Sequence, residues 1–386
     1  MEIFRTIVGP PAEGNVYFHR EYLDERLWRE IRKGEQLLVS APRRIGKTSF
    51  LKHVCKQENK GYFVKYFIIE SADSSNDFFK QLYTELLEHL SSKQRIWESL
   101  SDFRKSRQIE KIGPDGIELK AIDLDYFEEF KCLIKKVEIE EKLVFIIDEF
   151  SEVVENIINV RGEDHARKFL HQNRELRHKE EIITRVCFIY SGSIGLGNLA
   201  ESINATKIIN DLTEFQIPPL MQEEAFSMID QLSINPELAF ANNVQQYLID
   251  KINWLIPYYI QVILSELETL MIYSGKLPDH ETVDKAIDEA LKKRTYFEHW
   301  LVRLTKVYKE KDYDFAIQVL NNAAETEYGV SKNQIFDIGV NLGIKNESFR
   351  RILRMLEYDG YFNRNEKQIY SFSSPILRTW WERNVL

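Results

Sequence analysis

Apolar and polar positions divide the chain into two parts. In the first part, short and almost wholly apolar runs alternate with segments whose apolar residues recur at helical spacing. A continuous apolar run predicts a strand buried on both faces, as in a parallel sheet covered by helices. The expected strands are 36–40, 62–69, 143–147, 186–190 and 213–217, and the expected helices are 48–56, 76–90, 126–136 and 166–177. This alternation predicts an α/β fold with a doubly wound parallel sheet.

One segment, 107–123, interrupts the alternation. It contains Pro114, Asp115 and Gly116, followed by apolar residues at every second position. A Pro-Asp-Gly turn before such a run predicts a hairpin insertion. A solvated loop is the alternative.

The second part of the chain is predominantly helical. After residue 220 the periodicity predicts helices at 223–232, 244–252, 258–272 and 281–292, followed by 312–324, 331–338 and 347–358. Segments 361–364 and 368–372 then form a plausible hairpin, and three helices followed by a β-wing is the winged-helix arrangement. We therefore expect an α/β domain at 1–220, a helical lid at 221–295 and a winged helix at 296–386.

A phosphate-binding loop follows the first strand. The segment matches G-x-x-x-x-G-K-[ST] except that alanine replaces the first glycine, and its residues are Ala41, Pro42, Arg43, Arg44, Ile45, Gly46, Lys47, Thr48 and Ser49. Gly46 lets backbone N–H groups close around a phosphate, at the start of a helix whose dipole favours anions. Lys47 places a cation on the phosphates, and Thr48 presents a hydroxyl to Mg²⁺.

Two carboxylates end the apolar strand about a hundred residues later. Asp148 is expected to hold Mg²⁺ together with Thr48, and Glu149 to orient the attacking water. Small-molecule kinases seldom need a glutamate beside this aspartate. The pair therefore favours hydrolysis over phosphoryl transfer to a metabolite.

The strand 186–190 runs directly into Ser191, Gly192 and Ser193. Ligands gather at the carboxyl ends of open α/β sheets, so we expect Ser193 to touch the γ-phosphate or the water. An ordinary Ser-Gly turn is the alternative.

Composition narrows the class of protein. The chain has 386 residues, 44% of them hydrophobic and 29% charged, which excludes wholesale disorder. Cys55, Cys132 and Cys187 lie far apart, so no zinc or disulfide framework is implied. No apolar stretch reaches the ~20 residues of a membrane span, and the N-terminus lacks a secretory pattern. We expect a cytoplasmic protein that does not bind a membrane.

With these residues in hand, the chain resembles the archaeal-type ATPases of the AAA-related, STAND-like P-loop class, which also have bacterial members. The resemblance rests on 43–49, on Asp148-Glu149-Phe150, on 192–195, on 209–212, on 218–220 and on 372–381. It implies ATP as ligand, Arg20 as a residue that helps seat the adenine, and Pro257 as a nucleotide-sensing residue. Here His19 replaces the usual glycine before Arg20, and Leu255 replaces the glycine of Gly-x-Pro.

The winged helix adds a second candidate surface. The helix 347–358 carries three cations away from its apolar stripe, namely Arg350, Arg351 and Arg354. The wing carries two more, Arg364 and Lys367. Residues 331–386 hold nine Lys/Arg and six Asp/Glu, so 9 − 6 = +3, against −9 for the whole chain. This modest excess is compatible with double-stranded DNA or with a protein partner. Arg174 and Arg177 precede the strand 186–190, and a solvated charged face is expected there.

We therefore expect a slow Mg²⁺-dependent ATPase that acts as a nucleotide-driven switch. One alternative is a DNA-binding ATPase of the origin-recognition or mobile-element type. Another is a nucleotide-binding scaffold with negligible hydrolysis that partners a separate effector protein. Oligomerisation is a further expectation, since an ATPase of this kind can take an arginine from a neighbouring subunit.

Overall fold

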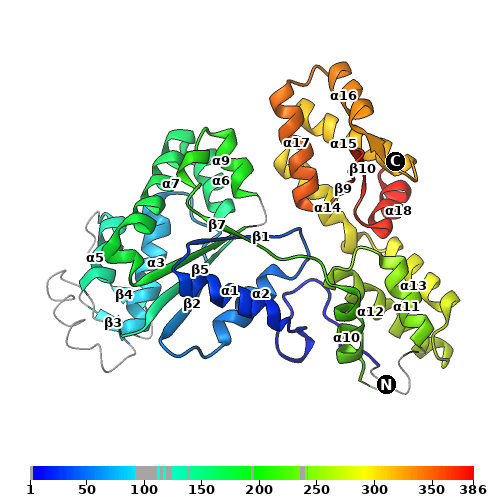
Figure 1. The fold of residues 1–386 in the computed structure, drawn as a ribbon, viewed down its shortest axis with the longest axis horizontal. Helices are drawn as coiled ribbons and strands as arrows, with labels where there is room; N and C mark the ends of the chain where they lie inside the picture. Colours follow the sequence, from blue (N-terminus) through cyan, green and yellow to red (C-terminus); the bar gives the residue numbers. More distant parts are fainter. Residues whose placement is uncertain are drawn as a thin grey trace. The chain divides into compact units, whose positions relative to one another are not determined.

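The computed structural model describes residues 3–91, 111–113, 116–118, 124–136, 140–192, 195–234, 240 and 242–386. These residues form two compact units, which we describe separately (Figure 1). The core unit comprises Arg20–Ser40 and Leu51–Gln216. The C-terminal unit comprises Met1–His19, Ala41–Phe50 and Ile217–Leu386, so it includes the loop that follows the first strand of the sheet.

A five-stranded parallel sheet organises the core unit. Its strand order is β2-β5-β6-β1-β7, with bounds β1 (Leu37–Ser40), β2 (Tyr62–Ile68), β5 (Lys142–Asp148), β6 (Val186–Ser191) and β7 (Thr213–Gln216). The five predicted strands are thus confirmed to within two residues. Because all strands run the same way, their carboxyl ends share one edge of the sheet.

Helices cover both faces of this sheet, as a doubly wound fold requires (Figure 1). On one face, aromatic side chains of the strands pack against the helices in a continuous core that includes Phe67, Phe145, Phe188 and Tyr190. The helices of the core unit are α1 (Glu21–Lys33), α3 (Ser75–Ser91), α5 (Tyr126–Lys136), α6 (Phe150–Arg161), α7 (Glu163–His178), α8 (Glu180–Ile183) and α9 (Leu196–Ser202), and α2 (Lys47–Lys56) continues into it from the loop. Within the predicted insertion, β3 (Lys111–Gly113) pairs antiparallel with β4 (Gly116–Glu118).

The C-terminal unit is helical apart from one small sheet. Its first helices are α10 (Gln222–Leu232), α11 (Asn242–Ile252), α12 (Pro257–Ser274) and α13 (His280–Lys292), and they form the lid. The N-terminal segment is attached to this lid, since the amide of Phe4 donates to Glu268 and that of Ile7 donates to the buried Gln261.

The remaining elements form the winged helix. They are α14 (Arg294–Val307), α15 (Glu310–Glu325), α16 (Lys332–Asn341), α17 (Asn346–Asp359), α18 (Pro375–Asn384) and a sheet of order β8-β10-β9, built from Val330–Ser331, Ile369–Phe372 and Phe362–Arg364. The apolar stripe of α17, which includes Phe349, Ile352 and Leu356, is buried as its spacing predicts. The expected boundary between residues 295 and 296 falls inside α14.

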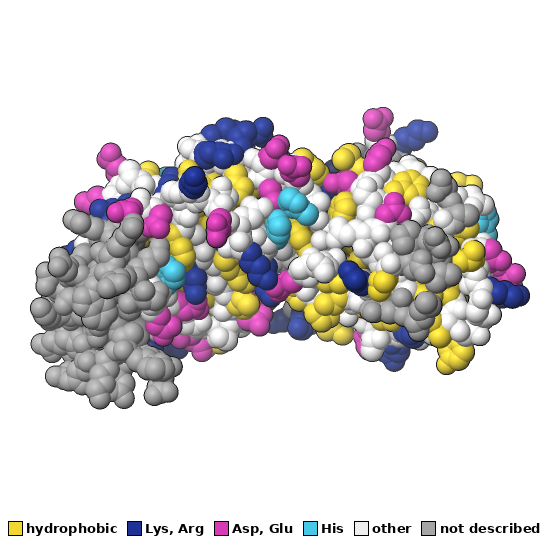
Figure 2. All heavy atoms as spheres, turned by 90° about the horizontal axis from the view of Figure 1, so that it is seen from below, with side chains coloured by type: hydrophobic (Ala, Val, Ile, Leu, Met, Phe, Trp, Pro, Cys, Tyr) yellow, Lys and Arg dark blue, Asp and Glu magenta, His cyan; other side chains and the backbone are white. Residues whose placement is uncertain are grey.

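Among the described residues, no helix is long and apolar enough to cross a bilayer. On the face seen in Figure 2, cationic and acidic side chains are interspersed.

Candidate nucleotide site

The loop between β1 and α2 has the backbone that a phosphate-binding loop needs. Gly46 has φ 94°, a left-handed conformation that glycine adopts without steric cost, and Arg44 also has a positive φ of 63°. Lys47 is the first residue of α2, so the amide groups of the first turn are available to an anion. The amide of Phe50 donates to the carbonyl of Gly46 over 2.9 Å, which continues the helix directly from the loop. The predicted residues 41–46 therefore form a loop that leads directly into the first turn of α2, which holds residues 47–49.

Residues of the lid pack against this turn. A Cβ atom added to Gly46 would lie 4.0 Å from Cγ of Pro257, which is the first residue of α12. The guanidinium of Arg44 lies 4.7 Å from the ring centroid of Tyr258 and donates to the carbonyl of Gly9 over 2.9 Å. Pro257 is thus next to the loop even though Leu255 replaces the family glycine.

Residues of α14 also lie beside the loop. His299 is largely buried, and its Nε2 atom lies 3.5 Å from Nε of Arg44. Burial, together with the charges of Arg44 and Arg43, lowers the pKa of His299 to about 2, so the ring is neutral at physiological pH. Burial and the charge of Arg303 lower the pKa of Arg43. Side chains far away in the sequence therefore surround the two arginines of the loop.

Asp148 is buried at the carboxyl end of β5 and is held by at least three donors. Tyr66 Oη donates to Oδ2 over 2.6 Å, while Ser191 Oγ and the amide of Glu149 donate to Oδ1. Tyr66 comes from β2 and Ser191 from β6, the two strands that flank β5. The carboxylate is thus oriented by side chains from both strands that flank β5.

Glu149 lies between β5 and α6 in a left-handed conformation, with φ 55° and ψ 30°. A non-glycine residue in this region costs of order 1–3 kcal/mol, and such residues cluster at functional sites. Its side chain is half-buried. An ordinary helix cap does not need this strained backbone, so the conformation of Glu149 is typical of a residue at a functional site.

The remaining predicted residues fall into different environments. Arg20 is buried before α1, and its guanidinium donates to Tyr22 Oη over 2.5 Å. Ser193 lies outside the described residues. Tyr66 and Ser191 were not predicted as site residues; the only signals in the sequence were a tyrosine inside an apolar strand and a serine at a strand end.

Arg177 corrects the expectation of a solvated charged face on α7. It is buried, and its guanidinium makes two hydrogen bonds to the Asp211 carboxylate, of 2.7 and 3.1 Å. Although burial disfavours the carboxylate charge, the hydrogen bonds and charge of Arg177 lower the pKa of Asp211 below its ordinary value. This pair joins α7 to the segment before β7, which accounts for the aspartate of the 209–212 motif.

The cations of the winged helix are only partly available. Arg350, Arg354 and Lys367 are exposed. In contrast, Arg351 pairs with Asp312 of α15 at 2.5 Å, and Arg364 pairs with Glu357 at 3.2 Å. At least two of the five predicted residues therefore already have an acidic partner within the domain.

Solved structures resemble the chain, although no family model and no curated protein match it. A Walker-type ATPase of Pyrococcus abyssi superposes with a TM-score of 0.60 at 14% identity, and the match covers 97% of this chain and 99% of that one. The Aeropyrum pernix ORC2 protein in ADPNP–ADP complexes gives a TM-score of 0.52 at 12% identity, covering 99% and 98%. The chain has the P-loop NTPase fold. The expected combination of a P-loop NTPase sheet, a helical lid and a C-terminal winged helix is confirmed.

Proposed function

We propose that this P-loop NTPase protein binds ATP with Mg²⁺ and hydrolyses it slowly, as a nucleotide-driven switch. The observation that carries the proposal is the turn at Gly46 and Lys47, which follows β1 of a parallel sheet whose strand β5 ends in Asp148 and Glu149. In such a sheet the carboxyl ends of the strands form the ligand-binding edge.

The residues present fit both ligands. Backbone amides around Gly46 and the Lys47 ammonium suit the phosphates of a nucleotide. A threonine hydroxyl at 48 and an oriented carboxylate at 148 are oxygen donors, which Mg²⁺ prefers. When bound, Mg²⁺ neutralises charge on the phosphate oxygens.

Each side chain has a separate role in this proposal. Lys47 binds the phosphate tail, and Tyr66 and Ser191 keep the Asp148 carboxylate in one orientation. Glu149 accepts a proton from the attacking water or orients it. Arg20 and Pro257 are proposed to contact the nucleotide, and Ser193 to contact its phosphate or the water.

The test is Glu149→Gln, which keeps the shape of the side chain and removes its basic carboxylate. ATP affinity should stay within error, and turnover should fall about 10²- to 10⁴-fold, the usual contribution of a general base. Equilibrium binding of ATP and single-turnover hydrolysis measure the two effects. The exposed Glu180 supplies the control, because Glu180→Gln should leave both unchanged.

Single-turnover data also separate this proposal from the scaffold alternative. Hydrolysis in the parent protein that equals the rate of the Glu149→Gln variant would remove Glu149 from the mechanism. Negligible hydrolysis in the parent protein itself would favour a scaffold that binds nucleotide and partners a separate effector protein.

A second candidate function is binding of double-stranded DNA by the winged helix. The exposed Arg350 favours it, because no hydrogen-bond or ion-pair partner of its side chain occurs in the described part of the chain. Its position on α17, away from the buried stripe, is that of a recognition helix.

A further inference from the structure

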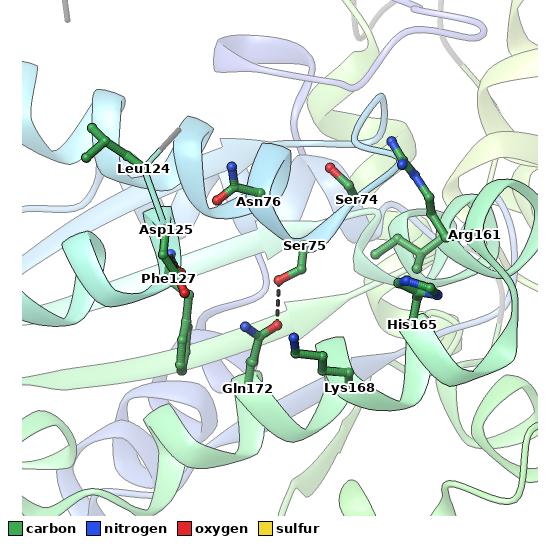
Figure 3. A pocket seen from close by; sticks show the side chains of 11 residues that line it. Ser74, Ser75, Asn76, Leu124, Asp125, Phe127, Arg161, His165, Lys168 and Gln172 are labelled. Carbon is green, nitrogen blue, oxygen red and sulfur yellow. Dashed lines mark hydrogen bonds between the residues drawn. The ribbon is translucent and has the colours of Figure 1, made fainter. Parts of the chain in front are cut away.

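A recessed pocket of about 410 Å³ lies in the core unit, apart from the residues assigned to ATP (Figure 3). One wall is the turn between β2 and α3 together with the start of α5, and the other is the hairpin of α6 and α7. It shares no residue with the loop 41–50 or with Asp148 and Glu149. Its size is in the range of small-molecule sites.

Donor groups dominate the wall formed by α6 and α7. Arg161 ends α6, and His165, Lys168 and Gln172 follow along α7 at intervals of three and four residues, so they share one face of that helix. Figure 3 shows Lys168 and Gln172 reaching towards Ser75 on the opposite wall.

These donors are available for a ligand. Among the described residues, neither Lys168 nor His165 has a hydrogen-bond or ion-pair partner. Gln172 accepts the Ser75 hydroxyl through Oε1 over 2.5 Å, which leaves both hydrogens of its amide nitrogen for another acceptor. Arg161 makes one long contact, of 3.4 Å, to Asp73.

Several acceptors of the pocket, by contrast, are already used. Asp125 Oδ1 accepts the amides of Phe127 and Glu128 over 3.1 and 3.3 Å, and Asn76 Oδ1 accepts the amide of Tyr126 over 2.9 Å. These bonds cap α5, so the partial positive charge of that helix start offsets the charge of Asp125. Apart from the second oxygen of Asp125, the charged groups of the lining that remain are two cations, Arg161 and Lys168.

We propose that this pocket binds the phosphate group of a small phosphorylated ligand. A phosphomonoester carries nearly two negative charges at neutral pH and three acceptor oxygens, which match the two fixed cations, the amide and the histidine ring. The side chains of Leu124, Phe127 and Ile157 supply an apolar part of the lining for the body of the ligand. The site is therefore additional to the proposed ATP site and has its own ligand.

The experiment uses the full chain carrying Lys47→Ala, so that the P-loop contributes little phosphate binding. Inorganic phosphate and phenyl phosphate are titrated calorimetrically. We expect both to bind, with phenyl phosphate tighter because its ring meets the apolar lining. Lys168→Met should weaken phenyl phosphate about tenfold or more, since it removes a charge-assisted hydrogen bond.

Controls make the result specific. Lys168 is exposed, so its replacement leaves packing intact. The matched control is Lys60→Met, because Lys60 is also exposed and precedes β2, at the opposite edge of the sheet. We expect this variant to bind phenyl phosphate with unchanged affinity. Absence of heat with both probes at millimolar concentration would overturn the proposal. An affinity for phenyl phosphate that Lys168→Met leaves unchanged would also overturn it. Single-stranded DNA binding that depends on Lys168, without phenyl phosphate binding, would reassign the pocket to nucleic acid and likewise overturn it.

Discussion

At the scale of single residues, two backbone positions define the carboxyl ends of β5 and β6. Glu149 adopts a left-handed conformation, and Gly192 lies where the end of β6 meets the first turn of α6. A Cβ atom on Gly192 would lie 1.7 Å from Ser151 Oγ and 3.1 Å from the Ser151 amide nitrogen. The second distance involves backbone, so rotation of the serine side chain would not remove the crowding.

Gly192→Ala should therefore destabilise the protein by about 1–3 kcal/mol, the usual cost of overpacking. Urea denaturation of parent and variant measures the change. Gly197 is the matched control, because a Cβ there meets nothing within 4 Å and its position in α9 favours alanine. If Gly192→Ala and Gly197→Ala had equal stability, the close approach of β6 and α6 would not require a glycine at position 192.

Candidate residues that stand in short motifs could be proposed from the sequence, whereas residues that orient Asp148 through pairing between strands could not. Lys47 and Asp148 stand in short motifs, next to the strand or helix that positions them. Tyr66 reaches Asp148 only because β2 pairs with β5 in a register that sets Ile68 beside Asp148. Ser191 does so because β6 lies on the other side. Register across a parallel sheet is a long-range property, which periodicity along the chain does not encode.

At the scale of elements, the loop between β1 and α2 is fixed by helices that are distant in sequence. Arg44 contacts Tyr258 of α12 and lies beside His299 of α14. His299 is neutral in the folded chain, with a pKa of about 2, whereas an unfolded histidine has a pKa near 6.5. Below about pH 6.5 the unfolded chain therefore takes up a proton that the folded chain does not.

This difference predicts a loss of stability in acid. Between about pH 7.5 and about pH 5.5, His299 should lower the free energy of unfolding by about 1.4 kcal/mol. His299→Phe removes this part of the pH dependence, and urea unfolding at the two pH values measures it. His171→Gln, at an exposed position on α7, should keep the parent's pH dependence. A His299→Phe variant as acid-sensitive as the parent would contradict the assignment.

Element prediction succeeded where apolar runs are bounded by turn residues, and it was less complete elsewhere. All five strands of the main sheet were predicted, but their order was not, because order follows from which edges pair. Helix α6 was also not predicted. Only Glu149 separates β5 from α6, and no glycine or proline marks the change.

At the scale of the whole molecule, the proposed binding of DNA depends on the winged helix. Two of its predicted cations, Arg351 and Arg364, already pair with acidic side chains, whereas Arg350 and Arg354 of α17 are exposed. If α17 is a recognition helix, Arg350→Ala together with Arg354→Ala should weaken duplex binding and reduce its salt dependence by about two phosphate contacts. Fluorescence anisotropy at several salt concentrations measures both.

Arg294 gives the control for this experiment. It is exposed on α14 and pairs with Glu298, so Arg294→Ala should leave duplex affinity unchanged. Failure of the parent protein to bind duplex even at low salt would exclude DNA and direct attention to a protein partner.

Packing at Gly360 limits how the protein can be shortened or recombined. A methyl group there would approach Trp254 to 2.5 Å and Pro42 to 3.1 Å, so the end of α17 lies against the loop that follows β1. A truncated fragment that stops at Gln216 would retain every strand of the main sheet and expose one side of that loop to solvent. A chimaera that exchanges the winged helix for another must likewise keep a glycine at position 360. Any larger residue there would collide with Trp254 and Pro42, which the exchange would leave in place.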